Sequence, residues 1–247
     1  MNVLVVTAVA PERDAVTRAC GEEPGRRALP GGYEAHRVRP ADAADDGPGQ
    51  ALPVLDVLAA GVGPAAAAAG TATALTAAAV ADEPYGLVVS AGIGGGFAAP
   101  GTGTGAVVVA SAIVAADLGA RTAEGFAPVT ALGFGTDTHH PPAGLVRAAA
   151  GATGAVTGPV LTVSTVTGTA ERAAELAALH PGAAAEAMEG FGVAEAAAAH
   201  GVPVLEIRTV SNPVGPRDRA AWRIPEALGA LGGAFEALLP VLRAWKA

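Results

Sequence analysis

The chain has 247 residues, with 15 Lys and Arg against 23 Asp and Glu, which gives a net charge of -8 at pH 7. An acidic chain without a basic run is poorly suited to follow a phosphate backbone, so we expect no nucleic-acid partner. Hydrophobic residues make up 51% of the chain and charged residues 15%, a composition that excludes a disordered protein and allows a large core.

Cysteine usage and the N-terminus indicate the compartment. Cys20 is the only cysteine, so an internal disulfide and a cysteine-cluster metal site are both excluded, and a cytoplasmic location is expected. The first residues, MNVLVVTAVAPERDAV, lack a basic start, and their apolar run ends after Ala10, which is too short to span a bilayer. We therefore expect neither a signal peptide nor a membrane anchor.

Short apolar and β-branched runs predict strands that are buried on both faces. The first covers Val3 to Thr7, and a helix with Pro11 in its first turn follows it. Residues 21–50 are rich in Gly, Pro, Arg and Asp and are compatible with a hairpin or a loop. A strand over 54–60 then leads through Gly61-Val62-Gly63-Pro64 into a long Ala-rich helix.

The second half of the chain continues this alternation of strands and helices. It predicts strands over 86–90, 105–110, 160–163 and 204–210, helices over 170–179, 185–199 and 225–246, and polar loops over 115–142. Buried strands that alternate with amphipathic helices predict an α/β fold, with a mixed or mainly parallel sheet covered by helices on both faces. Since no linker separates two cores, we expect residues 1–247 to form a single domain.

A glycine cluster, Gly92-Ile93-Gly94-Gly95-Gly96, follows the strand predicted over 86–90. Glycines after a strand allow backbone amides to approach a ligand closely, so we interpret this segment as a ligand-binding loop. A dinucleotide site is an alternative, because Asp117 lies about 20 residues further on. A strand rather than a helix is predicted after the glycines, however, which argues against a pyrophosphate site and leaves a purely structural turn as the other alternative.

Three polar residues stand next to predicted buried elements. Glu12 follows the first strand, Glu189 lies among apolar residues near the start of a predicted helix, and Asn212 ends the last strong strand. Each has an ordinary explanation: a first-turn helix acid, a cap or buried salt bridge, and a turn. Ligands of α/β sheets bind at the carboxyl edge, however, where a carboxylate can hold ribose hydroxyls and an amide can read a base.

The pair His139-His140, beside Pro141-Pro142, is the remaining feature that could suggest a metal site. It has no neighbouring acid or cysteine to complete a ligand set, so we expect no metal. No other cofactor is expected.

Taken together, several segments resemble the nucleoside phosphorylase and nucleosidase superfamily. They are VLVVTAVAPERDAV, VLAAGVGPAAAAAGTATAL, LVVSAGIGGGF and EAMEGFGVAEAAAAHGVPVLEIRTVSNPVG, and they span nearly the whole chain. Within the superfamily the similarity is to nucleosidases that hydrolyse methylthioadenosine, and more closely to a hydrolase of a 6-oxopurine nucleoside. The resemblance implies a three-layer fold with a mixed central sheet flanked by helices.

The resemblance also implies roles for individual residues. Glu12 matches the acid that activates water, Glu189 the residue that binds the ribose hydroxyls, and Met188 a residue that lies against the ribose. Asn212 occupies the base-reading position usually held by Asp, and Val166 forms part of the base-pocket wall. The other residues assigned to substrate binding are Gly92, Ile93, Gly94 and Phe191.

Three departures from the methylthioadenosine nucleosidase pattern stand out: Ala187 replaces an acid, Ile93 replaces a Ser, and Asn212 replaces the Asp. An Asn amide can donate to O6 of a 6-oxopurine while its carbonyl accepts a proton at N7. The amino group of adenine would instead face the amide donors, and an unpaired buried contact costs ~1 to 3 kcal/mol. We therefore predict a hypoxanthine nucleoside as the substrate.

Water is predicted to be the nucleophile, because Ser90 to Phe97 carries no cation that could bind phosphate. Arg13 could still reach a phosphate, so a purine nucleoside phosphorylase remains an alternative. A non-catalytic nucleoside sensor is another, since it would not need a water-activating acid. Relatives commonly form dimers or larger rings, so the resemblance also implies a homo-oligomer.

Overall fold

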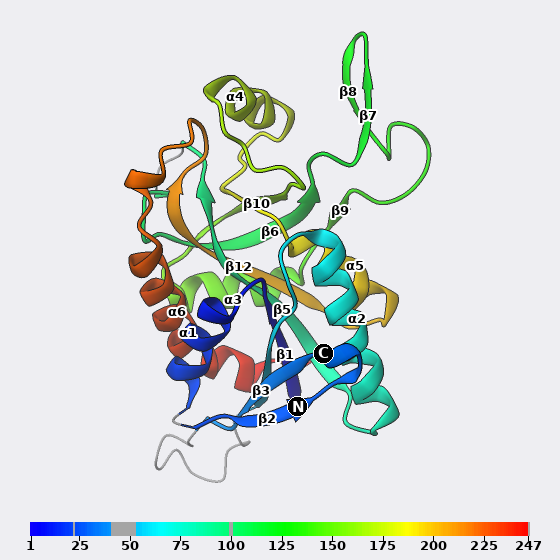
Figure 1. Cartoon of the computed structure of the whole chain (residues 1–247), viewed down its shortest axis with the longest axis vertical. Coiled ribbons are helices and arrows are strands. Elements are labelled where there is room, and N and C mark those ends of the chain that lie inside the picture. The colour runs from blue at the N-terminus through cyan, green and yellow to red at the C-terminus, as the bar shows by residue number, and fades with distance from the viewer. Residues whose placement is uncertain (22, 41–52, 99–100, 247) are drawn as a thin grey trace.

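The computed structural model describes residues 1–21, 23–40, 53–98 and 101–246, and its centre is a large mixed β-sheet (Figure 1). The strands are β1 (Asn2–Thr7), β2 (Gly25–Ala28), β3 (Glu34–Val38), β4 (Val54–Ala59), β5 (Tyr85–Gly96), β6 (Val107–Ala115), β7 (Gly119–Thr122), β8 (Gly125–Pro128), β9 (Thr138–His139), β10 (Val156–Thr162), β11 (Ala185–Ala187) and β12 (Val204–Pro213). The helices are α1 (Ala10–Cys20), α2 (Pro64–Val80), α3 (Ala143–Thr153), α4 (Ala170–Leu179), α5 (Gly190–Ala199) and α6 (Ile224–Ala244).

The sheet runs in the order β11-β10-β6-β12-β5-β1-β4-β3-β2, and β9 pairs with β6. Its middle is parallel, because β1 pairs in parallel with both β4 and β5, and β5 pairs in parallel with β12. The first strand of the path also folds back, so that β11 pairs antiparallel with the end of β5. This closure brings two distant segments to the carboxyl end of β5, where polar side chains gather.

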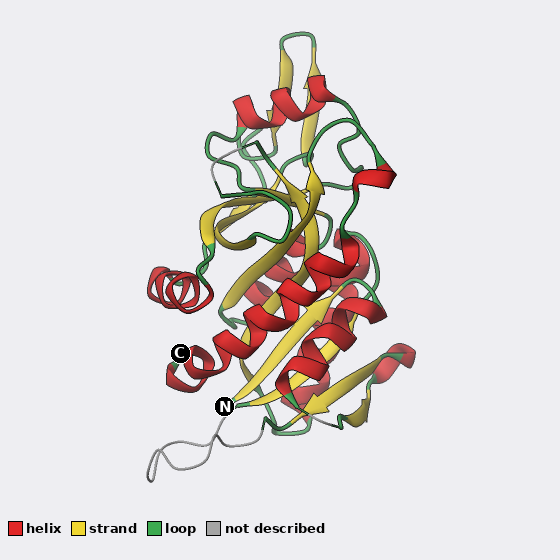
Figure 2. Cartoon of the chain, turned by 90° about the vertical axis from the view of Figure 1, so that its left-hand side faces the viewer, coloured by secondary structure: helices red, strands yellow, loops and turns green. Residues whose placement is uncertain are grey.

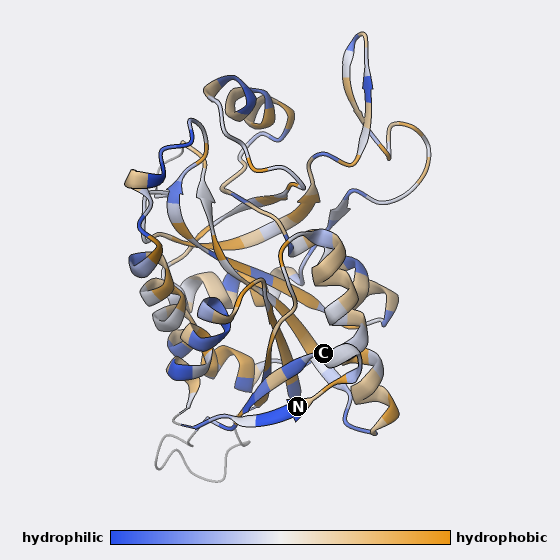
Figure 3. Ribbon diagram, in the orientation of Figure 1, coloured by the Kyte–Doolittle hydropathy of each residue, from blue (hydrophilic) through white to orange (hydrophobic). Residues whose placement is uncertain are grey.

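Helices cover the sheet on both faces. Helices α1, α3 and α6 contribute one apolar cluster, and α2 and α5 contribute the other, as the two sides of the sheet in Figure 1 show. The side view shows the same layers, with the β7–β8 hairpin projecting from one end (Figure 2). Hydropathy broadly follows the layers: the central strands are mainly hydrophobic, and most strongly hydrophilic segments lie on the outer elements (Figure 3).

The predicted α/β fold with a mixed, two-sided sheet is confirmed, and so are most of its elements. The strands begun at Val3, Val54, Val160 and Val204 are present, and α4 has the predicted bounds. Residues 25–38 form a hairpin of β2 and β3, one of the two alternatives for that segment, whereas residues 41–50 lie outside the described part. Helix α3 was not predicted.

The helix predicted over 185–199 is wrong at its beginning. Residues 185–187 form the short strand β11, and α5 begins only at Gly190, with Glu189 at its N-cap. Alanine favours helix by intrinsic propensity, but that preference is small compared with pairing on two sides, to β10 and to β5. The error matters because it assigned Glu186 to the wrong kind of element.

Two further loop predictions are also corrected. The glycine cluster belongs to strand β5 up to Gly96, because β12 pairs along it and β11 closes its end. Glycine is required there by crowding rather than by a turn, since a Cβ at Gly94 would lie 2.6 Å from the carbonyl oxygen of Glu186. The loop predicted over 115–142 contains β7, β8 and β9, short strands whose Gly and Thr residues carry little hydrophobic periodicity.

Helix α6 is long and apolar enough to cross a membrane by length and composition alone. Its buried residues belong to the same cluster as side chains of α1 and α3, and it contacts the sheet through β12 and β5. One face of α6 is therefore part of the core.

The contact between α2 and α5 generates a stability prediction. A Cβ at Gly192 would overlap the backbone carbonyl oxygen of Pro64, so Gly192→Ala must push the two helices apart. We expect this variant to lose about 1–3 kcal/mol, the usual cost of overpacking, when unfolding is followed in denaturant. The matched control is Gly229→Ala, also in a helix but with nothing within 4 Å of the added Cβ, which should gain about 0.5–1 kcal/mol. Equal stability of the two variants would contradict the close contact.

Candidate active site

A cavity of about 310 Å³ opens at the carboxyl ends of β1, β5 and β12. Six segments that are far apart in the chain converge on it. The lining residues are Ala8, Val9, Glu12, Val62, Ile93, Gly94, Gly95, Val166, Thr167, Glu186, Ala187, Met188, Glu189, Ser211, Asn212, Val214 and Trp222. The position at the strand ends agrees with the general location of ligand sites in α/β sheets.

Glu12 lies in the first turn of α1 and is 3% exposed. One carboxylate oxygen accepts hydrogen bonds from the backbone N–H groups of Ala8 (3.0 Å) and Val9 (3.3 Å), and the other accepts from the N–H of Ile93 at 2.8 Å. The bond to Val9 caps the helix, as the ordinary explanation of this acid supposed. The bond to Ile93 extends across to β5, so the same side chain is both a cap and part of the cavity wall.

Glu189 is 5% exposed and stands at the N-terminus of α5, next to Met188 in the cavity wall. It accepts hydrogen bonds from the N–H of Gly63 at 3.2 Å, the N–H of Met188 at 3.3 Å and the guanidinium of Arg208 at 3.2 Å. All three contacts are at the long end of the hydrogen-bond range, so donors from a ligand can compete for the same oxygens.

Arg208 is the principal residue that sequence reasoning missed. It is 1% exposed, on β12, and binds Glu206 (2.9 Å, from Nε), Glu189 (3.2 Å, from Nη1) and the Ser90 hydroxyl (3.1 Å, from Nη2). Gly92 allows this arrangement, because a Cβ there would lie 2.6 Å from a Glu12 oxygen and 2.8 Å from Nη1 of Arg208. The signal was present in the sequence: Glu206 and Arg208 alternate along one face of an otherwise apolar strand, which burial tolerates only for paired charges.

One cation lies among three buried carboxylates, so their charges are not balanced. Burial raises the pKa of Glu206, and the charge of Arg208 only partly opposes this rise. Burial also raises the pKa of Glu12, against the effects of Arg208 and the Ile93 hydrogen bond, while Glu189 adds to the rise. The raised pKa of Glu12 is closer to neutral pH than the pKa of an ordinary glutamate, which suits a general base.

A further carboxylate that was not predicted, Glu186, lies in the same wall at 5% exposure. It accepts hydrogen bonds from the Thr167 N–H at 2.9 Å and from the Thr167 hydroxyl at 2.5 Å. Burial raises its pKa, and the two Thr167 hydrogen bonds oppose that rise. The residue was assigned to a helix in the sequence, which concealed its place beside β5.

Asn212 lines the cavity from the end of β12, opposite Gly95 in the register of the sheet. Its carbonyl oxygen accepts from the Ser211 hydroxyl at 2.8 Å, and its amide donates to the Pro213 carbonyl oxygen at 2.9 Å. The carbonyl group is therefore held by a neighbour, which gives the amide a preferred orientation.

Of the other predicted site residues, some line the cavity and some do not. Ile93, Gly94 and half-exposed Val166 line the cavity, whereas Gly92 is not among the lining residues and instead makes room for Glu12 and Arg208. Phe191 is not among the lining residues: its ring lies 5.3 Å from that of His139, and its N–H donates to the Thr162 hydroxyl. Its buried position is that of a core residue that holds the start of α5.

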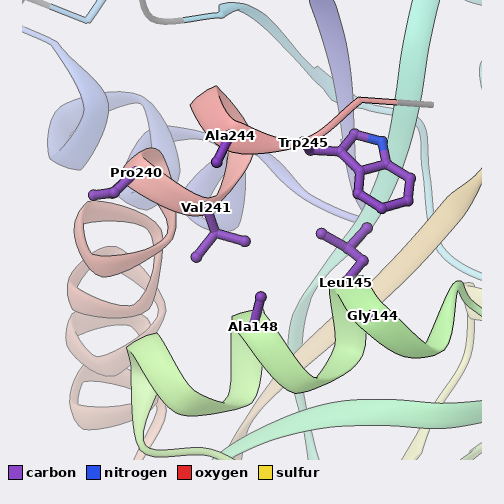
Figure 4. Close-up of a pocket in the computed structure, with 7 residues that line it drawn as sticks. All are labelled: Gly144, Leu145, Ala148, Pro240, Val241, Ala244 and Trp245. Atoms are coloured by element: carbon purple, nitrogen blue, oxygen red, sulfur yellow. The ribbon is translucent and has the colours of Figure 1, made fainter.

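Outside this cavity, a second hollow of about 310 Å³ lies between α3 and the end of α6 (Figure 4). Leu145, Ala148 and Val241 project into it, and its wall includes Trp245 but no acid or base. It therefore offers no group for acid–base chemistry. In the part of the chain that the structure describes, no three His, Cys, Asp or Glu side chains are placed to hold a metal ion.

Comparisons with known proteins agree with this architecture. The family model described as the phosphorylase superfamily matches residues 54–239. A futalosine hydrolase of Streptomyces coelicolor is 66% identical over 246 residues, which cover 100% of this chain and 98% of that protein.

Solved structures with low sequence identity share the fold. Native futalosine hydrolase of Helicobacter pylori strain 26695 matches with a TM-score of 0.77 at 17% identity, over 97% of each chain. The 5'-methylthioadenosine/S-adenosylhomocysteine nucleosidase of Neisseria meningitidis, in complex with methylthio-immucillin-A, matches with a TM-score of 0.77 at 20% identity, over 99% of each chain. The three-layer fold implied by the sequence resemblance is thereby confirmed.

The raised pKa of Glu12 predicts a pH dependence of stability. The folded state binds this proton more tightly than the unfolded chain, so the associated stability is full below pH about 4.5 and is lost as pH rises through the folded pKa. Glu12→Gln cannot ionise, so its stability relative to the unsubstituted protein should improve between pH 4 and pH 8. Each pKa unit of the rise corresponds to ~1.4 kcal/mol in denaturant unfolding. Glu171→Gln, which removes an exposed acid of α4, is the control, and an opposite trend for Glu12→Gln would show that its pKa is lowered instead.

Proposed function

Because this chain belongs to the phosphorylase superfamily, we propose that it hydrolyses the N-glycosidic bond of futalosine, releasing hypoxanthine and dehypoxanthine futalosine in menaquinone biosynthesis. The observation that carries this proposal is the convergence of Glu12, Glu189 and Asn212 on one cavity, from three distant segments. The close similarity to a named futalosine hydrolase supports the choice of substrate. The tail from Asn212 to Arg219 also resembles that of futalosine hydrolases.

The reaction passes through a state with positive charge on the ribose, and the cavity supplies negative charge to meet it. Glu12 and Glu189 line the cavity and share the single cation Arg208 with the fully buried Glu206, so the acids there exceed the cation that could neutralise them. Fixed charges aimed at a developing charge are among the largest contributions to catalysis. In this scheme Glu189 anchors the ribose hydroxyls, and Met188 contacts the sugar.

Glu12 is the residue proposed to hold and deprotonate the attacking water. Three backbone N–H groups fix its carboxylate, so it does not need to reorganise when it receives the proton. At the opposite end of the scissile bond, N7 of the leaving hypoxanthine takes up a proton from solvent water. Asn212 then accepts a hydrogen bond from N7–H through its carbonyl and donates one to O6 through its amide. The reaction as written requires no metal.

Hydrolysis is favoured over phosphorolysis by the charges at the glycine-rich strand. Among the described residues, the guanidinium that lies there is that of Arg208, and it is already bound to Glu206, Glu189 and Ser90. Arg13, considered earlier as a phosphate ligand, pairs with Asp14 at 2.8 Å and does not line the cavity. A phosphate ion would therefore meet carboxylates without a free cation to bind it.

We also propose that the chain acts as a cytoplasmic homo-oligomer with one nucleosidase domain over residues 1–247. Strands from both ends of the chain share one sheet, and Cys20 is a free, buried thiol. Large apolar side chains are exposed around the projecting β7–β8 hairpin, among them Leu118 at 43% and Phe134 at 64%. An apolar surface of this kind favours contact with another copy of the chain.

The function is tested by incubating the purified protein with futalosine, aminofutalosine and inosine, with and without phosphate, and separating the products by chromatography. We expect futalosine to release hypoxanthine at a rate independent of phosphate, and Glu12→Gln to lower that rate by about 10²- to 10⁴-fold. Ribosyl phosphate products would instead identify a phosphorylase. Binding without release of free base would identify a sensor.

Base selectivity provides a second prediction. Asn212→Asp replaces the amide donor with an acceptor, which suits the amino group of adenine better than O6 of hypoxanthine. We expect the ratio of kcat/KM for futalosine over aminofutalosine to fall by about tenfold or more, the cost of one mispaired buried contact. Unchanged selectivity would reject the assigned contact of Asn212 with the base.

A further inference from the structure

Glu186 is a buried acid in the cavity wall that the mechanism above does not use. It lies 5% exposed on β11, and the sheet places it directly opposite Gly95 of β5. Asn212 of β12 is opposite the same glycine, on the other side of β5. Registered partners project to the same face of a sheet, so Glu186 and Asn212 flank Gly95 on one face.

This arrangement has the dimensions of a purine site. Neighbouring strands lie ~4.8 Å apart, so the backbones that carry Glu186 and Asn212 are about 10 Å apart across β5. Glycine between them lets neighbouring side chains approach the strand: a Cβ at Gly95 would lie 2.9 Å from Val214 and 3.5 Å from the Asn212 amide nitrogen. Glu186 and Asn212 both line the cavity, so a flat ring bound between them can present one edge to Asn212 and the next to Glu186.

The chemistry of Glu186 is set by Thr167. The Thr167 N–H and hydroxyl both donate to the carboxylate, which stabilises its ionised form and uses two of its roughly four lone-pair sites. The donors of Thr167 are thus used by Glu186, and the remaining lone pairs of the Glu186 carboxylate are the acceptors that this part of the wall offers to the cavity. An acceptor at this point selects for a ligand that carries a hydrogen there.

We propose that Glu186 accepts a hydrogen bond from N1–H of the base and so makes the pocket specific for 6-oxopurines. This inference rests on the proposed function for the identity of the base. A 6-oxopurine carries a hydrogen at N1, whereas N1 of a 6-aminopurine is a lone pair that would face the carboxylate. Asn212 reads O6 and N7, and Glu186 reads N1, so the two residues together cover the edge on which the two purine classes differ.

The test measures binding of hypoxanthine and adenine by calorimetry, without turnover. In Glu186→Gln the side-chain oxygen is needed by the Thr167 N–H, so the new amide points its donor at the base. We expect the affinity ratio of hypoxanthine to adenine to fall by about 5- to 150-fold, the equivalent of one mispaired buried contact. Glu236→Gln, an exposed acid of α6 away from the cavity, is the matched control and should keep the ratio of the unsubstituted protein.

A purely structural role for Glu186 would weaken both bases alike and leave the ratio unchanged, and that result would overturn the proposal. A second measurement needs no variant: 1-methylhypoxanthine, which lacks the N1 hydrogen, should bind the unsubstituted protein at least about tenfold more weakly than hypoxanthine. Equal binding of the two bases would also overturn it.

The proposed function and this inference can fail separately. If the ratio depends on Glu186 but no nucleoside is hydrolysed, the base contact stands and the hydrolase function is rejected. If futalosine is hydrolysed and Glu186→Gln leaves the ratio unchanged, the function stands and the base contact is rejected.

Discussion

The cluster around Arg208 is the interaction on which the rest of the site depends. Its guanidinium is fully buried and holds Glu206 on its own strand, Glu189 at the start of α5 and Ser90 on β5. Removing one partner of such a buried ion pair costs far more free energy than the intact pair contributes to stability. The reason is that the remaining charge is left buried, with neither a partner nor water to solvate it. Arg208 therefore ties a helix terminus to two strands, and it fixes the distance between Glu189 and the strand end that carries Asn212.

Three glycines make this cluster possible by leaving out a side chain. Gly92 makes room for Glu12 and Arg208, and Gly190 makes room for Glu206, whose carboxylate would overlap a Cβ at that position. Gly192 lets the first turn of α5 lie against Pro64 at the start of α2, whose neighbour Gly63 donates to Glu189. The close packing of backbone around the acids keeps water away from them, which raises the pKa values of Glu12 and Glu206. The close approach of backbone at these glycines thus explains both the tight packing of the site and the raised pKa values of its acids.

The sequence predicted the parts of this site that stand at the ends of strong hydrophobic runs. Glu12 and Asn212 were visible because each ends an apolar run, and Glu189 because it interrupts one. Arg208 and Glu206 were harder to assign, since they lie within a strand where charge usually argues against burial. Glu186 was missed for another reason: its Ala-rich surroundings favour helix, and only pairing with β5 and β10, more than 20 residues away in the chain, makes it a strand.

The closure of β11 onto β5 connects the fold to the choice of ligand. Without it β5 would be paired beyond Ser90 only with β12, on one of its two edges. Pairing on both sides instead holds the backbone of Gly95 extended beside the cavity. This pairing also fixes the separation of Glu186 and Asn212, because both stand opposite Gly95. On this view the sheet sets where a base lies, and the residues at positions 186 and 212 set which base it is.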